Sequence, residues 1–138
     1  MEDNVQQNIK ILGNHIPGLS NNDVTFVRIS HSNFPFIISE IFTTFPNIES
    51  IEIFNGGLLR IQPEAFVDAR NLKSLVITHN LLNEIPTAAF IGARNLQVIN
   101  LRNNFIEFLR PNAFIGLNQV NELNMQSNWI SEIGRAHV

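Results

Sequence analysis

Residues that could act in catalysis or metal binding are present in this chain, but their spacing keeps them apart. His31 and His79 are separated by two intervals of 24 residues, and each such interval carries the same apolar pattern. If every interval forms one coil of a stack with about 4.8 Å between coils, the two imidazoles lie about 10 Å apart. Because the ligands of one metal ion lie about 2 Å from it, these histidines cannot share an ion. We expect solvated surface histidines and no metal site.

The other polar residues form no catalytic group. Carboxylates occur singly at Glu49, Glu52, Glu84, Glu107 and Glu122, and no nucleophile motif surrounds Ser30, Ser32, Ser50 or Ser74. The stretch Asn55-Gly56-Gly57 reads as a turn, because a phosphate loop needs a following lysine or helix. The chain has no cysteine, which excludes thiol catalysis, disulfides and cysteine-bound zinc. The sequence therefore predicts that the protein is not an enzyme and binds no cofactor.

Composition indicates one soluble domain and limits the partners. Of the 138 residues, 44% are apolar and 15% charged, as in ordinary globular domains. The net charge of −3, with basic residues scattered singly, favours neither nucleic acid nor an anionic membrane as a partner. No apolar run reaches the roughly 18 to 20 residues of a membrane helix, so we expect no membrane insertion. The first residues, MEDNVQQNIK, are polar and do not resemble a secretion signal.

The elements that position these side chains follow a repeat of 24 residues. Each period has apolar residues at its first, fourth and sixth places, beginning at Val24, Ile48, Leu72, Leu96 and Val120. The fourth and sixth places alternate with polar residues, which predicts a short strand with one buried face. Later in the period an asparagine recurs at Asn80, Asn104 and Asn128, and a phenylalanine at Phe42, Phe66, Phe90 and Phe114.

This pattern resembles the leucine-rich repeat, and the 24-residue period suits its typical extracellular class. The resemblance covers residues 24 to about 133. It implies an α/β fold: a curved, horseshoe-shaped solenoid with a parallel sheet on the concave face and an irregular or short-helical convex side. Words such as NGGLLRI and AFIGARNL further resemble secreted insect leucine-rich-repeat proteins, including immune receptors and Toll-like ectodomains. That likeness implies an extracellular, secreted location.

The recurring polar and aromatic residues have a structural role in such a stack. Where the chain leaves each strand, buried backbone groups need partners, and an asparagine amide offers two donors and an acceptor. We expect Asn80, Asn104 and Asn128 to form a ladder of this kind. The phenylalanines are expected to stack as a spine on the convex side. Ser32 and Gly56 occupy the asparagine place in the first two repeats, so the ladder begins at Asn80.

The chain divides into residues 1–23, an N-terminal flank or cap, and residues 24–138, about five repeats with the last incomplete. From Gly134 to Val138 the pattern fails, since Val138 stands where a phenylalanine is expected. This tail is either native sequence or foreign to the repeat. Ectodomains of the family are usually closed by cysteine-rich caps, and this chain has no cysteine. Either it is a fragment or something else covers its ends.

The outward positions of the strands form the candidate binding surface. Large rings at Phe26 and Phe54 stand where the pattern demands nothing apolar, and exposed aromatic residues commonly anchor protein interfaces. Candidates for binding a protein ligand or receptor are Phe26, Arg28, Phe54, Val76, His79 and Arg102. The predicted function is a non-catalytic protein-protein interaction module that uses the concave face. The resemblance implies that it is a fragment of an immune or receptor-type ectodomain.

A second column of apolar residues follows the asparagines at Leu81, Phe105 and Trp129, where the pattern leaves the residue free. These side chains either cover their own repeat or contact a second chain. The second alternative predicts a homodimer or higher assembly through the C-terminal repeat, with Trp129 central and Phe105 nearby. The alternative function is therefore a structural, self-assembling repeat that oligomerises through uncapped ends.

Overall fold

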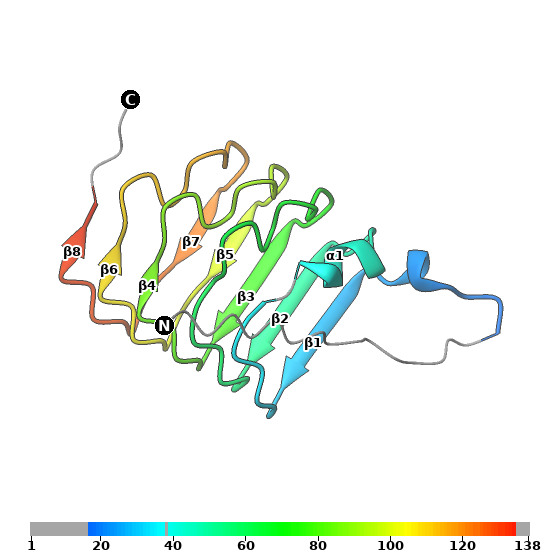
Figure 1. Ribbon diagram of the computed structural model, residues 1–138, viewed down its shortest axis with the longest axis horizontal. Coiled ribbons are helices and arrows are strands. Elements are labelled where there is room, and N and C mark those ends of the chain that lie inside the picture. The colour runs from blue at the N-terminus through cyan, green and yellow to red at the C-terminus, as the bar shows by residue number, and fades with distance from the viewer. Residues whose placement is uncertain (1–16, 38, 135–138) are drawn as a thin grey trace, which may run out of the picture.

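Two parallel sheets form the framework of the protein. The computed structural model describes residues 17–37 and 39–134, and residues 1–16, 38 and 135–138 lie outside the described part. The main sheet has the order β1-β2-β3-β5-β7, and a second sheet has the order β4-β6-β8. Figure 1 shows the successive coils standing side by side along the long axis of the molecule. The main-sheet strands are β1 (Phe26–Ser30), β2 (Ser50–Phe54), β3 (Ser74–Thr78), β5 (Val98–Asn100) and β7 (Glu122–Asn124).

The register of the main sheet follows the 24-residue period. Phe26 pairs with Ser50, Ser50 with Ser74, Ser74 with Val98, and Val98 with Glu122. Each pair joins equivalent positions of consecutive coils, so one turn of the chain adds one strand. This arrangement confirms the predicted solenoid with a parallel sheet.

The core consists of apolar columns that run across the coils. In β2 and β3 the burial alternates, with Ile51, Ile53, Leu75 and Ile77 at most 1% exposed and their neighbours partly open. Burying one such side chain contributes about 1.5–3 kcal/mol. No coil can enclose these residues alone, because the contacts that bury them come from the coils on both sides.

The other flank of each coil is extended chain and turns, with little helix. The second sheet consists of β4 (Glu84–Ile85), β6 (Phe108–Leu109) and β8 (Glu132–Ile133). Leading into it, Phe105 N donates to Leu82 O at 2.8 Å and Trp129 N donates to Ile106 O at 3.0 Å. In the described residues the only helical elements are α1 (Glu40–Thr44) and the 3₁₀ turn η1 (Asn21–Asp23). The period predicted buried residues on this flank but not this second set of strand pairings.

The N-terminal flank is described only from residue 17 onward. There η1 is capped by Ser20, whose hydroxyl accepts from Asn22 N while its backbone N–H donates to Asp23. Most of the predicted flank, residues 1–16, and most of the irregular tail that begins at Gly134 lie outside the described residues. Both assignments stay predictions.

The turns after the main-sheet strands share one backbone conformation. The residue before each ladder position has a left-handed φ between 49° and 58°, at His31, Asn55, His79, Asn103 and Ser127. Asparagine and histidine are enriched in this conformation. The recurrence of His31 and His79 is thus consistent with a backbone requirement of the turn.

Glycine is required at one turn of the convex side. Gly92 has a φ of +99°, and a Cβ there would lie 2.5 Å from both Cα and the carbonyl oxygen of Val67. Gly116 occupies the same place in the next coil with a φ of +86°, but its Cβ would meet only the Cδ1 methyl of Ile91, at 3.0 Å. The backbone of Val67 cannot move aside as easily as the Ile91 methyl group can. Gly92 therefore tolerates an added Cβ less well than Gly116 does.

We therefore expect Gly92→Ala to lower the free energy of unfolding by roughly 3 kcal/mol or more, the sum of left-handed strain and a backbone clash. Gly116→Ala carries the strain alone and should cost about 1–2 kcal/mol. Urea unfolding of the two variants measures the difference. If both variants lost the same free energy of unfolding, the backbone at Val67 would be able to move away from the new Cβ without cost.

Candidate functional site

A buried asparagine joins each of the later coils to the coil before it. Asn80 is 2% exposed, and its Oδ1 accepts from Gly56 N at 2.9 Å and Leu58 N at 3.2 Å. Its Nδ2 donates to Ile53 O and to Thr78 O, both at 2.9 Å. A single amide therefore satisfies backbone groups of two coils at the point where the strand ends.

The same geometry recurs one and two coils later. Asn104 Nδ2 donates to Ile77 O, and Asn128 Nδ2 donates to Leu101 O, each at 2.8 Å and each 27 residues back along the chain. Asn104 is 4% exposed, whereas Asn128 is only partly buried because it lies in the last described coil. This ladder fixes the ends of the strands from which the candidate surface projects.

The phenylalanines stack on the far side of the coils. Ring centroids lie 5.6 Å apart for Phe42–Phe66, 5.5 Å for Phe66–Phe90 and 5.8 Å for Phe90–Phe114. Phe42, Phe66 and Phe90 are buried, and Phe114 is partly buried. Contacts at such distances favour a fixed spacing of the coils.

A second, exposed asparagine ladder escaped the sequence analysis. Asn47, Asn71 and Asn95 donate their Nδ2 to the backbone oxygens of Asn22, Pro46 and Arg70, at 2.8, 3.0 and 2.7 Å. These asparagines are also 24 residues apart, directly before the first apolar residue of each period. That spacing was the signal that could have revealed them.

Within the described part of the chain, one face of the main sheet is exposed or half-buried, and it carries most of the predicted binding residues. We call it the open face; it bears Phe26, Arg28, Ser50, Glu52, Phe54, Ser74, Val76, Thr78 and, in later coils, Asn100, Arg102 and Asn124. Phe26 is 48% and Phe54 38% exposed. Val76 is half-buried between its neighbours, and Arg102 is exposed just beyond β5.

Ionic and aromatic contacts organise the first two strands of the open face. The Arg28 guanidinium lies 5.4 Å from the Phe26 ring centre and 2.8 Å from the Glu52 carboxylate. At the other end of β2, Phe54 stands between two imidazoles, with ring centres 5.8 Å from His31 and 5.1 Å from His79. The spacing predicts solvated surface histidines about 10 Å apart, and the structure brings both against Phe54.

The column after the ladder lies on the edge where the main-sheet strands end. Leu81 and Phe105 are each 47% exposed and Trp129 71%. Phe105 and Trp129 form an edge-to-face pair with ring centres 5.7 Å apart and planes at 83°. These two rings therefore contact each other and still present large surfaces to solvent.

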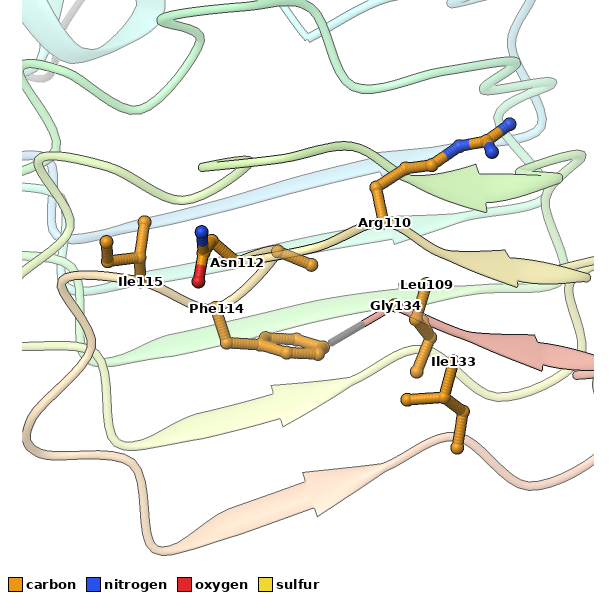
Figure 2. Close-up of a pocket in the computed structure, with 8 residues that line it drawn as sticks. Leu109, Arg110, Asn112, Phe114, Ile115, Ile133 and Gly134 are labelled. Carbon is orange, nitrogen blue, oxygen red and sulfur yellow. The ribbon is translucent and has the colours of Figure 1, made fainter. Parts of the chain in front are cut away.

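A hollow of about 340 Å³ opens at the last described coil. In Figure 2 the Phe114 ring, Leu109 and Ile133 line it, with Gly134 alongside. The next place in the phenylalanine column is position 138, outside the described residues. Since the lining is mainly apolar and few polar groups converge on it, the hollow reads as a continuation of the spine column rather than as a ligand site.

The described residues contain no cluster of side chains suited to a metal ion. Within residues 17–37 and 39–134, no group of three or more histidine, aspartate or glutamate side chains is arranged to hold a metal ion. In the same part of the chain no helix combines the length and apolarity of a membrane span. The arrangement presents a surface for contact.

A stack of parallel-strand coils with an asparagine ladder, a phenylalanine spine and an open sheet face defines a repeat scaffold of the interaction type. The leucine rich repeat family model matches residues 46–97 and 70–130, together more than half of the chain. The chain belongs to the leucine-rich repeat family, whose domains generally mediate protein-protein interaction and are typically non-catalytic. No curated protein matches the chain.

The two asparagine ladders differ in burial, which gives a matched pair of variants. Asn104→Ala leaves buried backbone groups without partners and should lower the free energy of unfolding by about 3 kcal/mol. Asn95→Ala exposes its former acceptor to water and should cost about 1 kcal/mol or less. Chemical unfolding of both variants tests this. If Asn104→Ala were as stable as Asn95→Ala, the buried ladder would not be what holds the coils in register.

Proposed function

We propose that the protein is a non-catalytic interaction module whose protein ligand binds the open face of the main sheet. The observation that carries the proposal is the exposure of Phe26 and Phe54. Both rings stand on the solvent side of strands whose alternation requires nothing apolar there. Exposed aromatic side chains are typical anchors of protein interfaces.

The spacing of the two rings suits an extended contact. Phe26 begins β1 and Phe54 ends β2, and the strands pair in register. Four residues of strand separate the two positions, about 13 Å along the sheet. The Arg28–Glu52 ion pair lies between them, with side chains 60% and 34% exposed. Such an exposed pair contributes at most about 1 kcal/mol to stability. A ligand could therefore contact or rearrange these two side chains at little cost to the fold.

We also propose an extracellular location and a receptor or immune-type role. The support is the resemblance of the repeat, with its 24-residue period, to secreted insect leucine-rich-repeat proteins. A gene whose product carries a signal peptide and flanking cysteines would agree with this role. Retention of the full-length product inside expressing cells would contradict it.

The open face is tested with a double variant, Phe26→Ser/Phe54→Ser. Because both rings are exposed, we expect the free energy of unfolding to change by about 1 kcal/mol or less, while proteins captured by the wild type from an extract of the source organism are lost. Quantitative mass spectrometry of the captured proteins provides the readout.

The matched control is Val67→Ser/Ile91→Ser, which removes two exposed apolar side chains beside the phenylalanine spine, 45% and 39% exposed. This control should retain the same ligand. If the open-face variant captures the ligand as well as the wild type does, the ligand binds elsewhere.

A second candidate function is self-association through the C-terminal repeat. What supports it is a set of exposed apolar side chains in the last coil: Leu123 at 42%, Trp129 at 71% and Ile133 at 72%. Among the described residues no strand pairs with the outer edge of β7, and an open sheet edge beside apolar side chains can pair with another chain.

Sedimentation of the wild type over a range of concentrations tests self-association. If this second function holds, the wild type forms a homodimer or larger species, and Trp129→Asp returns it to the monomer because a carboxylate would be buried in the contact. Val67→Asp serves as the control for added charge and should sediment as the wild type does. A wild type that stays monomeric at high concentration would exclude this function.

A further inference from the structure

The chain holds an arginine between an aromatic ring and a carboxylate at two separate places. On the open face, Arg28 lies over Phe26 at 5.4 Å and contacts Glu52 at 2.8 Å. On the second sheet, Arg110 lies over Phe108 at 4.9 Å and its Nε donates to Glu84 at 2.7 Å. Both combine a cation–π contact with an ion pair.

The two arrangements follow one sequence rule. In each, the arginine stands two residues after the phenylalanine, so in extended chain the side chains point to the same side. The carboxylate comes from a neighbouring coil, at Glu52 for Arg28 and at Glu84 for Arg110. A third ring, Phe36, carries the guanidinium of Arg60 from the next coil at 5.3 Å. Aromatic rings on the surface of this protein are thus repeatedly covered by arginine.

The Phe105–Trp129 pair has the ring and the carboxylate but no arginine. Two residues after Phe105 stands Glu107, where the other sites have an arginine. Phe105 and Glu107 are exposed and Ile106 between them is buried, so both side chains point outward. Among the described residues no guanidinium lies over either ring and no ion pair engages Glu107.

Backbone hydrogen bonds join the stretch that carries Glu107 to the stretch that carries Trp129. Ser131 N donates to Glu107 O at 3.0 Å, and Trp129 N donates to Ile106 O at 3.0 Å, so residues 105–107 run beside residues 129–131. The exposed Glu132 follows on the same stretch of the neighbouring coil. On the outer side of the second sheet Arg110 is already paired with Glu84, which leaves Glu107 and Glu132 as negative charges. The charge of this surface favours a cation.

We propose that the Phe105–Trp129–Glu107 site binds an arginine side chain of a different protein. Its guanidinium lies against the two rings and pairs with the Glu107 carboxylate, in the same combination of contacts that Arg28 and Arg110 make within the chain. The planar guanidinium stacks on rings and binds carboxylates with two donors, which an ammonium group cannot do. The site lies on the edge beyond the open face and is a second, separate contact.

Trp129 gives a direct signal for this contact, because it is the single tryptophan and the chain has no tyrosine. Titration with a short oligo-arginine peptide should change the tryptophan fluorescence to saturation, with an affinity that falls as salt is added. An oligo-lysine peptide of equal length should bind more weakly. Equal responses to the two peptides would reduce the effect to general charge attraction and overturn the proposal.

Single variants locate the binding. Glu107→Gln should weaken the arginine peptide roughly two- to fivefold, the loss expected for one exposed ion pair. Glu122→Gln, which removes the same charge from the main sheet, should leave the affinity unchanged. Trp129→Leu, followed with a fluorescently labelled peptide, should weaken binding by a similar roughly two- to fivefold factor. If Glu107→Gln and Trp129→Leu both bind as the wild type does, the site is wrong.

The competing occupant is a second copy of this chain. In that case the tryptophan emission would shift with protein concentration in the absence of peptide, and the peptide response would disappear at high protein concentration. Such a result would overturn the proposal in favour of self-association. The Phe26→Ser/Phe54→Ser variant should respond to the arginine peptide as the wild type does, so failure of the open face as a ligand site would leave this result unaffected.

Discussion

The structure depends on how buried backbone groups find partners where each main-sheet strand ends. The chain turns sharply there through a left-handed residue, and the N–H and C=O groups exposed by the turn face the core. Asn80 resolves this by accepting from Gly56 N and donating to Ile53 O, both in the preceding coil. The cost of leaving such groups unpaired is about 1–3 kcal/mol each, comparable to burying a core side chain. The ladder therefore contributes to stability and to register together.

Because of this constraint, some positions accept few residue types and others accept many. Positions that face the core or the turn are occupied by residues that the neighbouring coils require, such as Ile77, Asn104 and Phe66. Positions on the outer side of the strands are exposed or half-buried in the described part of the chain. An aromatic ring at Phe54 or Trp129 adds little to the scaffold, since much of its surface remains in water. The packing of the coils therefore does not require large rings at these exposed positions.

The repeat made much of this structure predictable from sequence, and what it missed has physical reasons. A period carried by apolar residues predicts coils, strands and buried positions, because burial is decided by side-chain type. The second sheet depends on backbone hydrogen bonds such as Arg110 N to Ile85 O, which cannot be read from residue type. The clustering of His31 and His79 around Phe54 arises because a left-handed turn directs both imidazoles toward the strand end. Spacing alone placed the histidines apart and could not show a ring between them.

Some exposed rings of this protein are in contact with an arginine of the same chain, and others are not. At Phe26, Phe36 and Phe108 a guanidinium of the same chain covers part of the ring, and at two of these a carboxylate completes the contact. These guanidinium contacts lie within the molecule, and Phe26 is still 48% exposed. Phe54 contacts histidines, and Phe105 and Trp129 contact each other. A cation placed against Trp129 gains more than one against Phe, because the indole is the best of the aromatic acceptors. The same chemistry that ties neighbouring coils together thus leaves, beside Glu107, an acceptor that a partner's arginine fits.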